Sequence, residues 1–279
     1  MTITELKQTA VEVRKGIVTA THAAKSGHPG GSLSATEIFT YLFFEEMNID
    51  PKNPKMEDRD RFVLSKGHTA PGLYAALANR GYFPVKDLET LRHIGSYLQG
   101  HPDMKHIPGV DMSSGSLGQG ISCAVGMALA GKMDQKDYRV YTLLGDGEIE
   151  EGQVWEAAMF AGHRKLDNLV VIVDNNNMQI DGTLEEVCSP DPIDKKFESF
   201  NFHVINVADG NDFEQLAAAF KEARETKGMP TAIIAHTIKG KGVSYMEGQV
   251  GWHGKAPNDE EYAVAMEELG KAGEALCQK

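Results

Sequence analysis

The chain has 279 residues, 41% of them apolar and 24% charged, a composition typical of a globular protein with one sizeable core. Its formal net charge of −12 argues against a nucleic-acid-binding surface, which would need clustered lysine and arginine. The apolar runs are far shorter than the roughly 20 residues that span a bilayer, and the N-terminus has no apolar signal core, so we expect a cytoplasmic protein without a membrane span.

In chain order, the sequence alternates helical patterns with short β-branched runs. The helical patterns cover residues 1–15, 36–47, 70–79, 119–133, 152–163, 213–226 and 259–279. The β-branched runs are Arg139 to Leu144, Leu169 to Asp174, His203 to Val207 and Thr231 to Thr237. This alternation predicts an α/β fold with a mostly parallel central sheet sandwiched by helices. No long linker divides the chain, so we expect a single domain over residues 1–279.

The helical pattern over residues 119–133 is unusually rich in small residues. The glycines lower helix propensity, but small side chains let backbones approach closely. We therefore expect a buried central helix that packs tightly against its neighbours.

Glycines flank an acidic residue directly after the first of these β-branched runs, in Gly145-Asp146-Gly147. Ligands of open α/β sheets bind at the carboxyl ends of the strands. The glycines let the backbone approach a phosphate closely, while the carboxylate of Asp146 stays free to hold a cation. Taken alone, the pattern is equally consistent with a tight turn before a helix.

A second polar segment, Asn175-Asn176-Asn177-Met178, follows the next strand. Two adjacent strand ends would bring Asp146 and Asn176 together. Mg²⁺ prefers six oxygen ligands and is often held by few protein groups together with phosphates. The Asp146 carboxylate, the Asn176 amide oxygen and the Met178 carbonyl would form such a shell with two diphosphate oxygens and a water. We expect a Mg²⁺–diphosphate site, in which Ca²⁺ or Mn²⁺ can substitute.

This paired pattern resembles the signature of thiamine diphosphate enzymes, and nearly the whole chain resembles transketolase. The resemblance rests on separated motifs in the family's order: Ser26-Gly27-His28-Pro29-Gly30-Gly31, Leu64-Ser65-Lys66-Gly67-His68, Gln99-Gly100-His101-Pro102, Gly115-Ser116-Leu117-Gly118-Gln119-Gly120 and Trp252-His253-Gly254. It implies the thiamine diphosphate-binding (PP-type) fold, with thiamine diphosphate and Mg²⁺ as cofactors. Where the family often has proline, this chain has Ser116.

The resemblance also implies roles for single residues. The catalytic candidates, which would face the hydroxyls of a sugar, are His28, His101 and His253. The cofactor-binding candidates are His68, Gly115, Leu117, Gly147, Asn176 and His253. Glu151 and Glu156 match positions between paired subunits in the family, although their pattern also suits a solvated helix face. Lys239 and Lys241 lie either over the cofactor entrance or in an exposed basic turn, and we do not assign them to the site.

A partner chain is a further implication. Transketolases continue through a pyrimidine-binding domain, whose glutamate activates the cofactor, and a C-terminal domain, and this sequence contains neither. We therefore expect a separate C-terminal transketolase subunit that supplies them, in an α2β2 assembly. Together the chains would transfer a two-carbon ketol unit from a ketose phosphate to an aldose phosphate.

Three rival interpretations stay open: half of a 2-oxo acid dehydrogenase, half of a deoxyxylulose-phosphate synthase, and a non-catalytic binding module with the same fold. The histidine set disfavours the first, because an acyl-transferring enzyme does not need so many imidazoles that face a sugar. The segment from Gly147 to Glu156 disfavours the second, because it resembles transketolase. The joint presence of metal ligands and histidines disfavours the third, because such polar clusters concentrate in catalytic sites.

Overall fold

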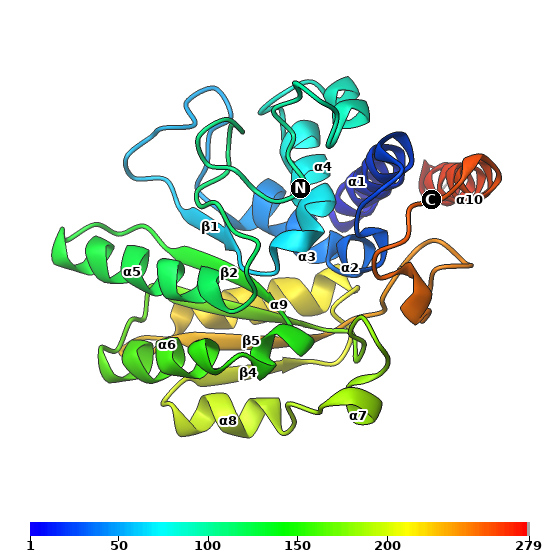
Figure 1. The fold of residues 1–279 in the computed structure, drawn as a ribbon. Coiled ribbons are helices and arrows are strands. Elements are labelled where there is room, and N and C mark those ends of the chain that lie inside the picture. Colours follow the sequence, from blue (N-terminus) through cyan, green and yellow to red (C-terminus); the bar gives the residue numbers. More distant parts are fainter. Residues whose placement is uncertain (278–279) are drawn as a thin grey trace.

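A five-stranded sheet forms the centre of the molecule in the computed structural model, which describes residues 1–277 (Figure 1). The strand order is β1-β2-β3-β5-β4, and every neighbouring pair is parallel. The strands are β1 (Arg61–Leu64), β2 (Val140–Gly145), β3 (Leu169–Asn175), β4 (His203–Val207) and β5 (Thr231–His236). Because all strands run the same way, their carboxyl ends lie along one edge of the sheet.

The predicted α/β fold is confirmed, and four of the strands match the predicted runs to within a residue at each end. The strand β1 escaped prediction. It is only four residues long and follows the charged residues Glu57 to Asp60, so it shows no extended β-branched pattern.

Helices cover both faces of the sheet (Figure 1). They are α1 (Ile3–Ala24), α2 (Pro29–Ser34), α3 (Thr36–Tyr41), α4 (Ala70–Arg80), α5 (Gln119–Met133), α6 (Gly152–His163), α7 (Leu184–Val187), α8 (Ile193–Ser199), α9 (Phe213–Glu225) and α10 (Asp259–Cys277). Helical turns of the 3₁₀ or π type are η1 (Leu42–Glu46), η2 (Gly67–Thr69), η3 (Val85–Thr90), η4 (Gly147–Glu150) and η5 (Val250–Trp252).

Alternate residues of each strand enter two separate cores. From β2, Tyr141 and Leu143 pack into the core formed with α1, α3, α4, α9 and α10. Val140 and Leu144 pack into the other core, formed with α5, α6 and α8. This two-residue period is what a sheet covered on both faces requires. The sandwich is therefore held together from both sides, and its carboxyl edge is left for polar residues.

The predicted helices differ from the structure in detail. The pattern over 36–47 forms α3, and then a π-helical turn, η1, in place of one regular helix. The last helix, α10, is described to Cys277, and the final two residues of the predicted helix lie outside the described residues. Among residues 1–277, no helix combines the length and the apolar character that crossing a bilayer requires.

The prediction that residues 119–133 form a buried central helix is wrong in one respect. The helix α5 exists with these bounds, but only one of its faces is buried. On that face Gly120 lies so close to β1 that an added Cβ would be 2.5 Å from the Cα of Ser65. On the other face Gly126 and Ala130 are exposed, because α5 lies at the outside of the sandwich. Small residues on α5 therefore serve close approach on one side and an open surface on the other.

Candidate active site

The polar residues after β2 and β3 meet at the carboxyl edge of the sheet. Gly145 at the end of β2 pairs in register with Asp174 on β3. The next residue, Asp146, accepts a hydrogen bond at Oδ2 from the backbone N–H of Asn177, at 2.5 Å. The two strand ends thus lie side by side, as the sequence predicts, and they bring Asp146 next to the asparagine segment.

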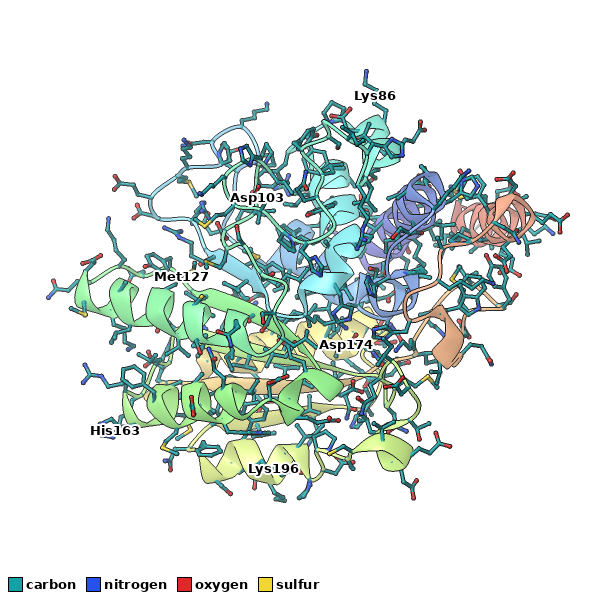
Figure 2. The ribbon with its side chains drawn as sticks, in the orientation of Figure 1. Lys86, Asp103, Met127, His163, Asp174 and Lys196 are labelled. Atoms are coloured by element: carbon teal, nitrogen blue, oxygen red, sulfur yellow. The ribbon has the colours of Figure 1, made fainter. Side chains whose placement is uncertain are left out.

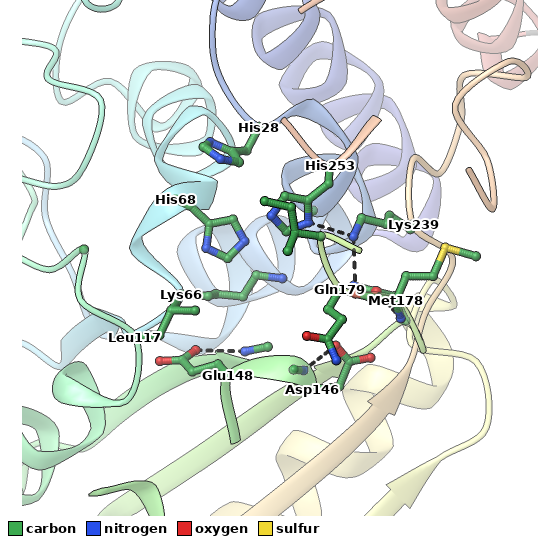
Figure 3. A pocket seen from close by; sticks show the side chains of 16 residues that line it. His28, Lys66, His68, Leu117, Asp146, Glu148, Met178, Gln179, Lys239 and His253 are labelled. Atoms are coloured by element: carbon green, nitrogen blue, oxygen red, sulfur yellow. Dashed lines mark hydrogen bonds between the residues drawn. The ribbon is translucent and has the colours of Figure 1, made fainter. Parts of the chain in front are cut away.

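A cavity of about 270 Å³ opens above these strand ends (Figure 3). Most of the residues predicted to bind cofactor, metal or sugar line it. Its lining residues are His28, Gly31, Lys66, His68, Gly115, Leu117, Gly145, Asp146, Gly147, Glu148, Asn176, Met178, Gln179, Ile180, Lys239 and His253. The apolar side chains of Leu117 and Ile180 are 36% and 62% exposed, and most of the other lining residues have polar side chains.

The predicted metal ligands form the floor of this cavity. The carboxylate of Asp146 is buried and accepts hydrogen bonds from the backbone amides of Gly147, at 2.8 Å, and Asn177. Burial, and then the nearby carboxylate of Asp174, raises the pKa of Asp146 to about 7. The amide oxygen of Asn176 accepts from the N–H of Met178 at 3.2 Å. The buried carboxylate of Asp146 is hard to ionise, and the two oxygens beside it are neutral. A cation bound between these oxygens would stabilise the ionised carboxylate.

Asp174 forms a buried network behind these oxygens. Its carboxylate is 2.5 Å from Nζ of Lys66, and both side chains are almost fully buried. The hydroxyls of Ser34 and Thr237 also donate to it, and so does Nδ2 of Asn176, at 3.2 Å. Because the NH₂ group of Asn176 donates to Asp174, the amide oxygen of Asn176 points away from that carboxylate. This is the orientation that a metal ligand needs. The side chain of Asp174 is fully buried, and Figure 2 labels it near the middle of the view.

Three imidazoles form a triangle over the cavity. The ring centroids of His28 and His68 are 5.2 Å apart, those of His28 and His253 are 5.5 Å apart, and those of His68 and His253 are 5.2 Å apart. Burial, followed by the charge of Arg92, lowers the pKa of His28 to about 4. Burial and then Lys239 lower the pKa of His253 to about 3, and burial and then Lys66 lower that of His68. All three rings are therefore neutral near pH 7.

Lys239 is a site residue that the sequence analysis left unassigned. It is 2% exposed, and its Nζ lies 3.2 Å from the carbonyl oxygen of Met178 and 2.9 Å from Nδ1 of His253. Burial and then the neighbouring Lys66 lower the pKa of Lys239 to about 8. Because the ammonium donates to Nδ1, the imidazole of His253 carries its proton on Nε2. The signal that could have identified Lys239 is its place just after β5, the strand next to β3.

Glu148 is a second unassigned residue in the cavity wall. It is 3% exposed. Its Oε1 accepts from the hydroxyl of Ser65, at 2.5 Å, and from the N–H of Gly118, at 2.9 Å, while Oε2 accepts from the N–H of Gly145, at 3.0 Å. One carboxylate thus ties together the end of β1, the start of α5 and the end of β2.

The other predicted residues lie around the cavity. His101 does not line the cavity, but its ring packs on Gly115, which does line it. Glu151 and Glu156 are exposed on α6 and at its start, outside the cavity. Their predicted roles towards sugar and subunit interface stay predictions, as do those of the residues that line the cavity.

The donor set fits a diphosphate that is bound through a divalent cation. Among residues 1–277, no group of three or more histidine, cysteine, aspartate or glutamate side chains is arranged around a possible metal position. A cation here would depend on one carboxylate, two neutral oxygens and oxygens of the ligand, as Mg²⁺ does beside phosphates. Nδ1 of His28 is buried without a partner in the described part of the chain, so the cavity also offers an unused hydrogen-bonding group.

Comparison with known proteins agrees with this geometry. The family model for the transketolase, thiamine diphosphate binding domain matches residues 6–276. The 6-deoxy-6-sulfo-D-fructose transketolase subunit of Clostridium sp. (strain MSTE9) is 49% identical over 88% of this chain and 90% of its own length. An apulose-4-phosphate transketolase subunit of Phocaeicola vulgatus is 42% identical over 99% of this chain and 98% of its own.

Solved structures agree as well. The crystal structure of transketolase from Campylobacter jejuni superposes with a TM-score of 0.91 at 32% identity, over 99% of this chain and 46% of that one. This chain therefore spans nearly all of the two subunits but less than half of that transketolase. On the strength of the family match and of these relatives, the chain belongs to the transketolase N-terminal, thiamine diphosphate-binding family.

Proposed function

We propose that this chain is the diphosphate-binding subunit of a two-subunit transketolase, which transfers a two-carbon ketol unit from a ketose phosphate to an aldose phosphate. The observation that carries the proposal is the single cavity in which the Asp146–Asn176–Met178 oxygens lie below a triangle of neutral imidazoles. The two relatives of similar length, both named as transketolase subunits, support the same conclusion.

In this proposal Asp146, Asn176 and the Met178 carbonyl hold Mg²⁺, and the metal together with Gly147, His68 and Lys239 holds the diphosphate. Lys239 is the cation best placed for this, because Lys66 is already neutralised by Asp174. Leu117 and Ile180 supply exposed apolar contacts for the rings of the cofactor, and Gly115 supplies backbone contacts. Thiamine diphosphate, once bound, supplies an electron sink that the protein side chains do not have.

The neutral imidazoles carry out proton transfer in this scheme. With the proton of His253 on Nε2, this nitrogen can donate a hydrogen bond to a sugar oxygen, while Nδ1 stays bonded to Lys239. His28 offers its unpartnered Nδ1 in the same space. A neutral imidazole accepts or returns a proton near pH 7 without a large free-energy cost, which suits the transfer of protons between hydroxyl and carbonyl oxygens. His101, beside Gly115, would contact the sugar from the mouth of the site.

A partner subunit completes the proposal. The outer faces of α5 and α6 carry large apolar side chains that are well exposed, namely Met133 at 73%, Met159 at 59% and Phe160 at 43%. Methionine and aromatic side chains are enriched in protein interfaces. We propose that this surface, with Glu151 and Glu156, contacts the C-terminal subunit that carries the pyrimidine-binding domain and the activating glutamate. The complete enzyme would be an α2β2 assembly.

The test uses the purified chain with and without its C-terminal partner, in the presence of thiamine diphosphate and Mg²⁺. We expect ketol transfer from a ketose phosphate only when both chains are present, and no comparable use of pyruvate as donor. Turnover by this chain alone would contradict the need for a partner subunit. A preference for pyruvate as donor would contradict the proposed ketol transfer.

Single substitutions in the assembled enzyme test the metal site. We expect Asp146→Ala and Asn176→Ala to abolish Mg²⁺-dependent binding of thiamine diphosphate, measured by calorimetry. Asp181→Ala is the matched control, because Asp181 is an exposed carboxylate a few residues beyond Met178 and lies outside the cavity. Unchanged affinity in both site variants would show that the metal is held elsewhere.

A further inference from the structure

Lys239 is buried in the cavity without a counter-charge of its own. The residue is 2% exposed, and its Nζ bonds to two neutral groups, the carbonyl oxygen of Met178 and Nδ1 of His253 (Figure 3). The other lysine that is buried to this degree in the described part of the chain, Lys66, has the carboxylate of Asp174 opposite it. A buried ammonium without such a partner is in an unfavourable position, so we expect the backbone around Lys239 to be held in place by other residues.

The backbone that carries Lys239 forms a loop after β5, and we call residues 237–248 the lysine loop. These residues form no helix or strand. Hydrogen bonds within the loop, such as the one from the N–H of Gly248 to the carbonyl of Lys239 at 2.9 Å, give it its shape. Its position against the rest of the molecule depends on bonds to other elements, of which one joins the N–H of Gly240 to the carbonyl of Gly30 at 2.9 Å.

Two polar side chains from outside the lysine loop hold its backbone on either side of the lysine. On one side, Oδ1 of Asn211 accepts from the N–H of Ile238 at 3.0 Å. On the other side, Nε of Arg14 donates to the carbonyl oxygen of Lys241 at 2.8 Å. The backbone passes so close to the arginine that a Cβ built on Gly242 would lie 2.7 Å from Nε. These two side chains therefore fix the stretch of backbone from which the lysine projects.

One buried carboxylate, that of Glu37 on α3, joins these two side chains. Its Oε2 accepts from Nη2 of Arg14 at 2.8 Å and from Nδ2 of Asn211 at 2.9 Å. The side chains of Arg14 and Glu37 are 8% and 7% exposed, so solvent screens their ion pair little. Arg14 belongs to α1, and Asn211 lies between β4 and α9. The carboxylate thus connects three separate elements to the lysine loop, although none of the three residues lines the cavity.

Stability alone does not account for this arrangement. Apolar residues of similar volume often stabilise a core as well as a buried ion pair does. What apolar residues cannot supply is a donor for the carbonyl of Lys241 and an acceptor for the N–H of Ile238, and the network supplies both. The bonds that reach the lysine loop are therefore the part of the network that packing would not replace.

We propose that Glu37 acts, through Arg14 and Asn211, as a positioning residue that sets the place of Lys239 in the diphosphate site without contact with the ligand. The inference rests on the proposed function, because it concerns a lysine that the proposed function assigns to the diphosphate.

Two substitutions of Glu37 test the proposal in the full chain, with binding of magnesium pyrophosphate measured by calorimetry. In Glu37→Gln, an amide oxygen in the place of Oε2 keeps an acceptor for both donors, whereas Glu37→Met has no such acceptor. Both remove the counter-charge of Arg14, so an effect of the charge itself is common to both. We expect Glu37→Met to raise Kd by about 5- to 10-fold and Glu37→Gln to stay within about 2-fold of the wild type. Urea unfolding checks that both variants are folded.

Asn211→Ala provides the same test without a buried charge, in case Glu37→Met does not fold. Asn211 is half-buried, and its loss removes the acceptor for Ile238. We expect Kd to rise by about 3- to 10-fold. The matched control is Asn168→Ala, which removes another half-buried asparagine, bonded to the carbonyl of Ala128 at 2.9 Å and placed just before β3, at the opposite edge of the sheet. We expect the control to bind within about 2-fold of the wild type.

Combination with Lys239→Met shows whether the network acts through the lysine. In a chain that already lacks the ammonium, Asn211→Ala should raise Kd by less than about 2-fold. A purely structural role would raise Kd by the same factor in both backgrounds.

Each outcome decides between these roles. A loss in Glu37→Met and Asn211→Ala that disappears in the Lys239→Met background would establish the positioning role. Wild-type affinity in Asn211→Ala and Glu37→Met, an equal loss in Glu37→Gln and Glu37→Met, or effects of Asn211→Ala and Lys239→Met that simply multiply would overturn it and leave the proposed function standing. Wild-type affinity in Lys239→Met, or no binding by the wild-type chain, would overturn the proposed diphosphate site and the inference with it.

Discussion

Glu148→Gln tests whether the buried carboxylate in the cavity wall holds three segments together. Glutamine has the same shape but only one acceptor oxygen. If that oxygen keeps the bonds from Ser65 and Gly118, the amide NH₂ faces the N–H of Gly145, and this buried donor loses its acceptor. The substitution therefore creates one unsatisfied amide and turns two charge-assisted hydrogen bonds into neutral ones.

The magnitude follows from these three bonds. A buried unsatisfied donor costs about 1–3 kcal/mol, and each weakened charge-assisted bond costs about 1 kcal/mol more. The burial of the charge has the opposite effect. Burial raises the pKa of Glu148, which shows that the ionised carboxylate is destabilised there, and glutamine avoids this cost. The three terms sum to about 3–5 kcal/mol, and the avoided burial of the charge offsets part of this sum, so we expect the free energy of unfolding to fall by about 2 kcal/mol.

Urea unfolding of the isolated chain at pH 7, followed by far-ultraviolet circular dichroism, measures this loss. Glu150→Gln is the matched control, because Glu150 is exposed and has one hydrogen bond, from Gln179 at 2.9 Å. We expect it to change stability by less than about 0.5 kcal/mol. If Glu148→Gln is as stable as the wild type or more so, desolvation outweighs the three bonds, and the reasoning about this carboxylate is wrong.

Three more predictions concern Asp174, Lys239 and His28. Asp174→Asn should lower the free energy of unfolding by about 3–5 kcal/mol, because it leaves Lys66 buried without a counter-charge. The control is Glu198→Gln, which removes an exposed ion pair with Lys195 and should cost less than about 1 kcal/mol. Lys239→Met should weaken binding of magnesium pyrophosphate to the chain by about 10- to 100-fold, measured by calorimetry, with no loss of stability; equal affinity would remove Lys239 from the diphosphate site. The pKa of His28 is about 4 when folded and about 6.5 when unfolded, so the stability due to its neutral ring is complete above pH 6.5 and is lost as the pH falls towards 4. This loss is at most about 1.4 kcal/mol per pH unit, and His28→Gln should flatten the decline in urea midpoints between pH 6.5 and 4.5.

The sequence predicted the sheet well where a strand is long and lies between clear helical patterns. It missed β1, since four residues after a charged turn carry too little periodicity. It also overestimated the burial of α5, because small residues indicate close approach without indicating how many sides are approached. Fold class depends on patterns summed over many residues. The short strand β1 and the exposed face of α5 depend instead on which single element lies beside them.

The cavity likewise contains residues that a local sequence pattern predicts and residues that it does not. The glycines around Asp146 and the asparagine segment after the next strand predicted that Asp146 and Asn176 lie close together, because both segments follow directly after long strands. Lys239 and Glu148 carry no such local signal. Each becomes part of the cavity through strand order, since β5 lies next to β3 and β2 next to β1. A residue whose role depends on which strands are neighbours can be assigned only after the order of the strands is known.

The charges of the cavity make metal and diphosphate binding interdependent in the proposed enzyme. Asp174 neutralises Lys66, and Glu148 is satisfied by neutral donors, so Lys239 and Asp146 are the principal charges left to face a ligand. One ammonium opposite one carboxylate that ionises near pH 7 gives little net attraction for a multiply charged diphosphate. A divalent cation reverses this, because it lowers the pKa of Asp146 and supplies the missing positive charge. By linkage, the diphosphate must then raise the affinity for the cation by the same factor. We therefore expect this half of the site to bind both together and neither tightly alone.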